Sequence, residues 1–122
     1  MTTDAFDAQA FPRRIYGMLV LGSLAGGPKH GYQIALDVEE RSGGWFVLQY
    51  GTLYPILHRL EAAGMIEGEW SGGDGERRRK VYGLTAEGRV ELSQGSDWVQ
   101  RVLRRLSHVL EGRPDERSGT SG

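Results

Sequence analysis

Cysteine is absent from the sequence of 122 residues. Its absence excludes disulfide bonds, thiolate zinc sites and cysteine nucleophiles. Long apolar runs are also missing, because the longest one, MLVLGSLAG, is far shorter than the roughly 20 residues of a membrane-spanning helix. The first residues, MTTDAFDAQAF, carry acids where a signal peptide carries bases. We therefore expect a soluble cytoplasmic protein with no membrane partner.

An excess of positive charge is lacking as well. The formal net charge is -1, so any binding to nucleic acid must depend on a local basic cluster. The length suffices for one compact domain and is too short for two ordinary ones. The histidines, His30, His58 and His108, fall on separate predicted helices without metal-ligand spacing, and no nucleophile motif is present. We expect neither an enzyme nor a cofactor or metal.

Apolar residues at helical spacing predict four helices. The first runs from Pro12 to the GGP break, the second covers YQIALDVEER before Gly43, and the third lies in residues 49–66 and ends at Gly64. The fourth runs from Ala86 to about Glu111, with Thr85 as its N-cap. Between the third and the fourth, MIEGEW and KVYGL predict the strands of a hairpin with SGGDGERRR at its tip.

This order of elements is that of a winged helix, in which the second and third helices form a helix-turn-helix and the hairpin is the wing. The predicted class is mainly α with a small β-hairpin, followed by a long C-terminal dimerisation helix. We expect a loosely ordered segment over residues 1–11, the winged helix domain over 12–85, the dimerisation helix over 86–112 and a disordered tail over 113–122.

The third helix has an unusual outward face. Its inner stripe is Leu53, Ile56, Leu57 and Leu60, and the opposite side carries Gly51, Pro55, His58 and Ala62. Lys and Glu would favour a surface helix, whereas Gly and Pro destabilise one. Because the second helix of a helix-turn-helix enters the DNA major groove, a slim face has a physical reason. The alternative is a surface helix that packs one face and does nothing else.

Pro55 has two interpretations. If the helix starts with Thr52 as N-cap, Pro55 lies in the first turn, where its missing N–H has no helical partner to lose. If the helix starts near Gln49, Pro55 lies inside it and should bend it.

Three motifs, HGYQIALDVEERSGG, GTLYPILHRLEAAGMI and YGLTAEGR, resemble the PadR family of transcriptional regulators in order and spacing. The resemblance covers about residues 15–90 and implies a winged helix, a C-terminal dimerisation helix and repression of a nearby promoter. The family commonly has a small capping residue and a proline before GTLYP. Here Gln49 and Tyr50 stand there, which puts the family's contacts at this point in question.

The candidate contacts to double-stranded DNA fall into four groups. They are Lys29, His30 and Tyr32 at the start of the second helix; Gln49 and Tyr50 before GTLYP; Thr52, Tyr54, Pro55, His58 and Arg59 in the third helix; and Arg77, Arg78, Arg79 and Lys80 in the wing. Strand alternation predicts that Arg77 and Arg79 share a face. Other interpretations stay open: Tyr54 covers the edge of the core, His30 is a turn or cap residue, and the basic run is a solvated strand.

The last helix carries a broad apolar stripe, made of Trp98, Val99, Val102, Leu103, Leu106, Val109 and Leu110. Such a stripe predicts a homodimer interface, and its alternative is packing against the chain's own helices. Some PadR-like proteins bind flat aromatic compounds between their dimer helices, so the resemblance makes Trp98 a candidate ligand contact, with core anchoring as the alternative.

The predicted function is a sequence-specific repressor that acts as a homodimer on a palindromic operator and is relieved by a small aromatic ligand. The alternative is a winged helix that serves as a protein interaction module and does not bind DNA.

Overall fold

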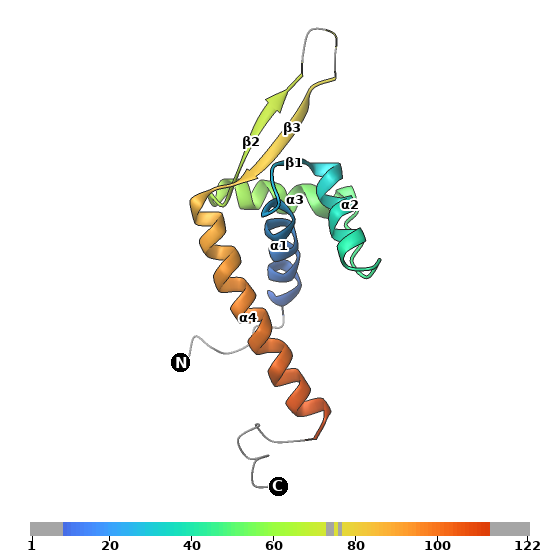
Figure 1. Cartoon of the computed structure of the whole chain (residues 1–122), viewed down its shortest axis with the longest axis vertical. Coiled ribbons are helices and arrows are strands. Elements are labelled where there is room, and N and C mark those ends of the chain that lie inside the picture. The colour runs from blue at the N-terminus through green and yellow to red at the C-terminus, as the bar shows by residue number, and fades with distance from the viewer. Residues whose placement is uncertain (1–8, 73–74, 76, 113–122) are drawn as a thin grey trace. The chain divides into compact units, whose positions relative to one another are not determined.

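A computed structural model describes residues 9–72, 75 and 77–112. The elements are α1 (Phe11–Leu24), β1 (Lys29–His30), α2 (Gly31–Arg41), α3 (Tyr50–Ala62), β2 (Ile66–Ser71), β3 (Arg79–Leu84) and α4 (Ala86–Leu110) (Figure 1). The predicted class, mainly α with a small β-hairpin, is confirmed. The chain forms two compact units, residues 1–92 and 93–122. Within the described ranges, every helix is too short or too polar to cross a membrane.

The core of the first unit lies among α1, α2, α3 and the sheet. The apolar stripe predicted for the third helix is buried along its whole length. The side chains that are almost completely excluded from solvent are Val20, Leu21, Leu24, Ile34, Leu53, Leu57 and Ile66. Burial of these aliphatic groups supplies the main stabilising free energy of a small domain.

The start of α3 answers the question about Pro55. Gln49 is the N-cap, and its carbonyl accepts hydrogen bonds from Thr52 N–H at 2.9 Å and Leu53 N–H at 2.8 Å. Helix α3 therefore begins at Tyr50, and Pro55 lies inside it. Because proline has no N–H, the carbonyl of Gly51 lacks its α-helical partner four residues along the chain. The other interpretation, with Thr52 as N-cap, is wrong.

The end of α3 matches the prediction. Gly64 has a φ of 78°, a left-handed conformation that glycine adopts without a steric penalty. Its N–H donates to the Glu61 carbonyl at 3.0 Å, and Met65 N–H donates to the Leu60 carbonyl at 2.9 Å. This pair of hydrogen bonds is a Schellman motif, and it turns the chain directly into β2.

The sheet has one strand more than the predicted hairpin. Its order is β1-β3-β2, with both pairs antiparallel. The added strand, β1, pairs Lys29 with Tyr82 and His30 with Val81, and it leads directly into α2 (Figure 1). A strand of two residues carries no periodicity of its own, and its pairing is distant in sequence, so the sequence pattern did not reveal it.

Thr85 joins three elements at the base of the hairpin. Its Oγ1 accepts a hydrogen bond from Gly88 N–H at 3.0 Å, which confirms Thr85 as the N-cap of α4. The same hydroxyl donates to the carbonyl of Gly64 at 2.6 Å. A Cβ atom on Gly88 would collide with the carbonyl oxygen of Met65. Glycine is therefore required where α4 passes the end of α3.

A polar contact ties α1 to α2. Ser23 is buried, and its hydroxyl donates to Oδ2 of Asp37 at 2.7 Å. Arg41 adds an ion pair to the same carboxylate oxygen at 3.3 Å. The hydrogen bond from Ser23 is the main cause that lowers the pKa of Asp37, with a smaller contribution from Arg41, while burial opposes the shift. The ionised form of Asp37 is thus the one that fits the fold.

The predicted loose segment and the predicted tail lie at the two ends of the chain. Phe11 is the first residue of α1, and Pro12 stands in its first turn, where a missing N–H is tolerated. Of the predicted loose segment, residues 1–11, Gln9 and Ala10 form a turn before α1, and residues 1–8 lie outside the described residues, as does the predicted tail, residues 113–122.

Candidate nucleic-acid interface

The outward face of α3 is slim in the folded protein. Gly51, Thr52, Pro55 and His58 are all exposed. A Cβ atom built on Gly51 would have no other atom within 4 Å, and the residue does not have a positive φ. Neither packing nor backbone conformation therefore requires glycine at this position. What glycine provides is a stretch of helix backbone that another molecule can approach closely.

Tyr54 lies where α3 crosses the start of α2. Its hydroxyl oxygen would be 2.8 Å from a Cβ atom on Gly31, and its ring makes an edge-on contact with Tyr50 at a centroid distance of 5.8 Å. The side chain still exposes 40% of its surface. Tyr54 therefore packs against the start of α2 and also presents surface beside Gly51 and Pro55.

The predicted DNA contacts at the start of α2 form interactions within the folded chain. The ammonium of Lys29 donates to the Ser23 carbonyl at 2.6 Å. His30 is the N-cap of α2, and its backbone N–H donates a hydrogen bond to Oε1 of Gln33 at 2.9 Å. The rings of His30 and Tyr32 stack at 5.7 Å. The interpretation of His30 as a cap residue agrees with this geometry.

Arg79 connects the wing to α2. Its Nη1 donates to the hydroxyl of Tyr32 at 3.0 Å, and its guanidinium lies 5.3 Å from the centre of the Tyr32 ring. With His30 beneath Tyr32, three side chains form one stack from β3 to the start of α2. A cation held over an aromatic face is stabilised by the ring's quadrupole, so this contact helps to hold the wing against α2.

The two cations that flank Arg79 in the sequence lie on a different side of the hairpin. Arg78 lies 5.3 Å and Lys80 5.8 Å from the centre of the Trp70 ring. Lys80 also forms an ion pair with Glu61 of α3 at 3.1 Å, so its charge is compensated within the chain. Because successive side chains of a strand point to opposite faces, Arg78 and Lys80 lie on the face opposite to that of Arg79.

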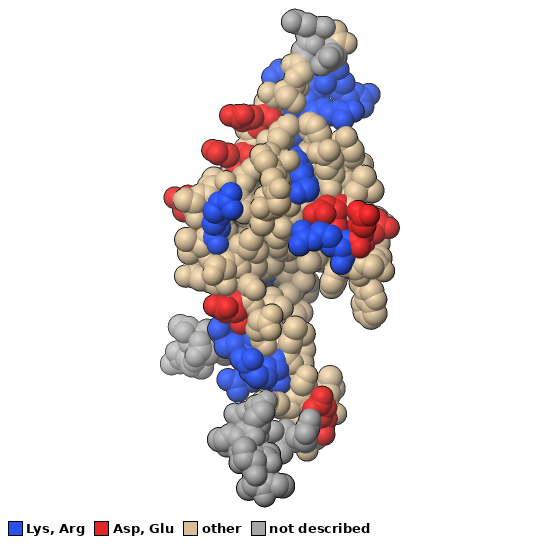
Figure 2. All heavy atoms as spheres, in the orientation of Figure 1, with Lys and Arg blue, Asp and Glu red and all other residues tan. Residues whose placement is uncertain are grey.

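Trp70 is a surface feature that the sequence interpretation missed. Its indole is 58% exposed, and it stands opposite Lys80 in the hairpin register. The sequence did carry a signal for Trp70, because an aromatic residue faces a basic run across the predicted hairpin. Figure 2 shows basic side chains gathered toward the outer part of the hairpin, with acidic side chains along its edge. Glu67 and Glu69 of β2 are exposed there, whereas Asp74 and Glu76 lie outside the described residues.

Arg59 lies on the flank of α3 that meets α1. Its Nη2 donates to the carbonyl of Arg13 at 3.4 Å. Burial, and to a lesser degree the charge of Arg13, lowers the pKa of Arg59, although a guanidinium stays protonated in proteins. In this arrangement Arg59 is directed toward α1 and leaves His58 and Thr52 on the open face.

The second unit contains the part of α4 from Ser93 to Leu110. Leu103, Leu106, Val109 and Leu110 are exposed, the last two by 78% and 81%. Trp98, Val99 and Val102 are half-buried. An exposed apolar stripe on a helix is typical of a surface that binds another protein chain.

Metal chemistry gains no support from the described part of the chain, where no group of three or more His, Asp or Glu side chains could hold an ion.

The comparisons with known proteins agree with this geometry. A sequence model of the transcriptional regulator PadR-like family matches residues 20–94. The transcriptional regulator Rv3488 of Mycobacterium tuberculosis is 34% identical over 109 residues, which cover 89% of this chain and 94% of the relative.

Two solved structures are also similar. A transcriptional regulator from Clostridium thermocellum has a TM-score of 0.71 at 24% identity, over 84% of this chain and 95% of the other. Bacillus subtilis PadR in complex with operator DNA has a TM-score of 0.62 at 30% identity, over 72% of this chain and 48% of the other. These similarities establish the winged helix fold.

Proposed function

The chain belongs to the PadR-like family of transcriptional regulators, and from this membership we propose that it is a homodimeric repressor that binds a palindromic DNA operator. The observation that supports this proposal most strongly is Gly51. It lies in an exposed helix face with open space around it, so no contact within the described chain requires its small size, whereas close approach of a partner would. The operator complex of Bacillus subtilis PadR makes DNA the partner to test. Such a repressor acts in the cytoplasm.

In the proposed complex α3 enters the major groove. Gly51, Tyr54 and Pro55 let the helix approach the bases, while Thr52 and His58 offer hydrogen-bonding groups to base edges. Gln49 and Tyr50 contact bases or phosphates beside them. Arg59 adds a contact to a phosphate or a guanine when it leaves the carbonyl of Arg13.

The wing supplies the phosphate contacts. Arg77, Arg78 and Arg79 are exposed cations on the hairpin, and each phosphate that they neutralise releases counterions. Trp70 adds an apolar surface beside Arg78. Lys29, His30, Tyr32 and Lys80 act less as direct contacts than as groups that hold α2 and the wing in position, because each already has a partner in the chain.

The apolar stripe of α4 is the proposed dimer interface. Residues 99, 102, 103, 106, 109 and 110 recur at the three- and four-residue spacing of a helix pair. A two-fold dimer would present two copies of α3 to half-sites about 34 Å apart. A planar aromatic compound held at Trp98 between the paired helices is the proposed inducer.

Fluorescence anisotropy tests the proposal directly. The protein is titrated into labelled DNA from the region upstream of its own gene and into a shuffled duplex, at several salt concentrations. We expect tighter binding to the upstream DNA and a linear loss of log affinity with log salt concentration. Equal, weak binding to both duplexes would contradict the repressor and favour the interaction module.

Sedimentation analysis and tryptophan quenching test the two remaining parts. A dimer that dissociates in Leu106→Glu supports the interface on α4. Quenching by planar aromatic compounds that disappears in Trp98→Phe supports the inducer site, whereas unchanged quenching in that variant would contradict it.

A further inference from the structure

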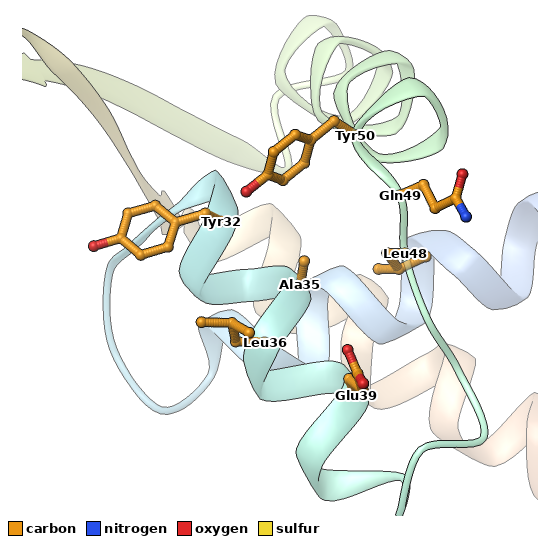
Figure 3. A pocket seen from close by; sticks show the side chains of 7 residues that line it. All are labelled: Tyr32, Ala35, Leu36, Glu39, Leu48, Gln49 and Tyr50. Atoms are coloured by element: carbon orange, nitrogen blue, oxygen red, sulfur yellow. The ribbon is translucent and has the colours of Figure 1, made fainter.

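A pocket of about 320 Å³ lies between α2 and the start of α3. Figure 3 shows the side chains that line it, which are Tyr32, Ala35, Leu36, Glu39, Leu48, Gln49 and Tyr50. Its volume is at the small end of the range for ligand sites, and the pocket is largely open to solvent. All of its lining residues belong to the first unit, and Trp98 is not among them.

The chemistry of the pocket differs from one end to the other. The tyrosine rings lie at one end and the carboxylate of Glu39 at the other, with Ala35, Leu36 and Leu48 between them (Figure 3). Tyr50 and Leu36 are exposed by 57% and 60%, so apolar surface is available to a ligand. A molecule with an aromatic ring, a short apolar linker and a terminal charge matches this sequence of surfaces.

Glu39 determines the sign of that charge. Its side chain is exposed and forms no ion pair with any residue in the described ranges. An uncompensated carboxylate attracts a cation and repels phosphate, which argues against the DNA backbone as the occupant. The ring of Tyr32 already contacts Arg79 and His30, so the exposed ring of Tyr50 is the aromatic surface open to a ligand.

We propose that this pocket binds small arylalkyl ammonium compounds, with the aromatic ring beside Tyr50 and the ammonium beside Glu39. Gln49 and Tyr50 line the pocket and belong to the proposed DNA contacts. A bound ligand therefore competes with operator DNA, and this second step rests on the proposed function. The binding step itself does not depend on DNA.

Heteronuclear NMR titration of the full chain tests the binding step without DNA. The probes are phenylpropylammonium, neutral phenylpropanol and anionic phenylpropionate, which share one shape and differ in charge. We expect saturable shifts of the amides of Ala35, Leu36 and Leu48, and the tightest binding for the cation. Glu39→Gln should weaken cation binding by up to about fivefold, the upper end for an exposed charge pair, and leave phenylpropanol binding unchanged.

Glu40→Gln is the matched control, because it removes a neighbouring exposed carboxylate that does not line the pocket. This variant and Trp98→Phe should bind the cation as the original protein does. Equal affinities for the three probes, an equal loss in both glutamate variants, or shifts centred on Trp98 would overturn the proposed site. If the cation binds the site but leaves the affinity for operator unchanged, the competition step is wrong and the site remains. If the protein binds no operator at all, only the proposed function is wrong.

Discussion

The hydroxyl oxygen of Tyr54 lies 2.8 Å from the position that a Cβ atom would occupy on Gly31. Glycine at the first position of α2 thus makes room for a side chain of α3, and the two helices of the helix-turn-helix meet at this point. The neighbouring ring atoms of Tyr54 are only 3.2 and 3.4 Å from the same position. Gly31 therefore controls where Tyr54 lies on the proposed reading face.

Gly31→Ala should move Tyr54 more than it destabilises the fold. The colliding atom is the tip of a half-exposed side chain, which can swing away, so we expect a loss of less than about 1 kcal/mol in the free energy of unfolding. Operator affinity should fall several-fold because the displaced ring obstructs the face beside Gly51. Chemical denaturation and anisotropy measure the two effects.

The double variant Gly31→Ala with Tyr54→Phe is the control for this contact. Removing the hydroxyl removes the closest collision, so part of the lost stability should return. A loss of stability that is identical with and without the hydroxyl would show that the contact with Tyr54 is not its cause.

Gly51→Ala separates the needs of the fold from those of the DNA. Alanine is favoured over glycine by about 0.5–1 kcal/mol in the middle of a helix, and Gly51, the second residue of α3, should gain somewhat less; the structure has room for the methyl group. We expect a more stable protein that binds operator about tenfold more weakly, equivalent to roughly 1.4 kcal/mol, because the methyl group meets the DNA. Thermal unfolding and anisotropy are the measurements.

Gly22→Ala is the matched variant. Gly22 is also helical and has no other atom within 4 Å of a built Cβ atom, but it lies on α1. It should stabilise the protein without changing operator affinity. If Gly51→Ala also left operator affinity unchanged, the close approach of DNA to α3 would be refuted.

Gly88→Ala should have the opposite effect on stability, although Gly88 is helical as well. Helix propensity alone predicts a gain, but the new methyl group would collide with the backbone carbonyl of Met65, and a backbone atom cannot swing away. We expect a loss of about 2–3 kcal/mol in the free energy of unfolding, measured by chemical denaturation. A gain would mean that α4 can shift away from the end of α3 at little cost.

The sequence predicted the elements that depend on local pattern and missed those that depend on distant contacts. The inner stripe of α3, the turn at Gly64 and the cap at Thr85 each follow from residue types within one helix turn. Strand β1 escaped prediction because Lys29 and His30 acquire their strand character from Val81 and Tyr82. Only a long-range pairing reveals such a strand.

The candidate site shows the same division. The slim face of α3 could be read from the sequence, because helical periodicity places its residues together. The roles of the basic run could not, since RRRK looks uniform until folding places Arg79 on Tyr32 and Lys80 on Glu61. The exposed Trp70 beside Arg78 and the pocket at Glu39 likewise arise from contacts between elements.

Asp37 should make stability depend on pH in the acid range. Its pKa is lowered in the folded protein, mainly by the hydrogen bond from Ser23, so it contributes stability above the ordinary carboxylate pKa of about 4. That contribution is lost as the pH falls through the lowered pKa of the folded state. We expect a loss of about 1 kcal/mol from this group, seen as a decline in the free energy of unfolding below about pH 4.

Asp37→Asn is the variant that checks this assignment, because an amide still accepts a hydrogen bond but does not titrate. The variant should be less stable at neutral pH and should lose less stability on acidification than the original protein. An acid decline of the same size in both proteins would place its origin in other carboxylates.

Arg79 and Lys80 are neighbours in sequence with different expected roles, and the salt dependence of DNA binding distinguishes them. Arg79→Ala should weaken binding to all duplexes about equally and lower the slope of log affinity against log salt by about one, the value for one lost phosphate contact. Lys80→Ala should leave the slope nearly unchanged, because the ammonium is already paired with Glu61. It should instead lower the free energy of unfolding by about 1 kcal/mol, since Glu61 is left half-buried without its partner. Adding Glu61→Gln to Lys80→Ala should restore part of that stability. If Arg79→Ala and Lys80→Ala lowered the salt slope equally, Arg79 would not be the cation that contacts DNA while Lys80 serves the fold.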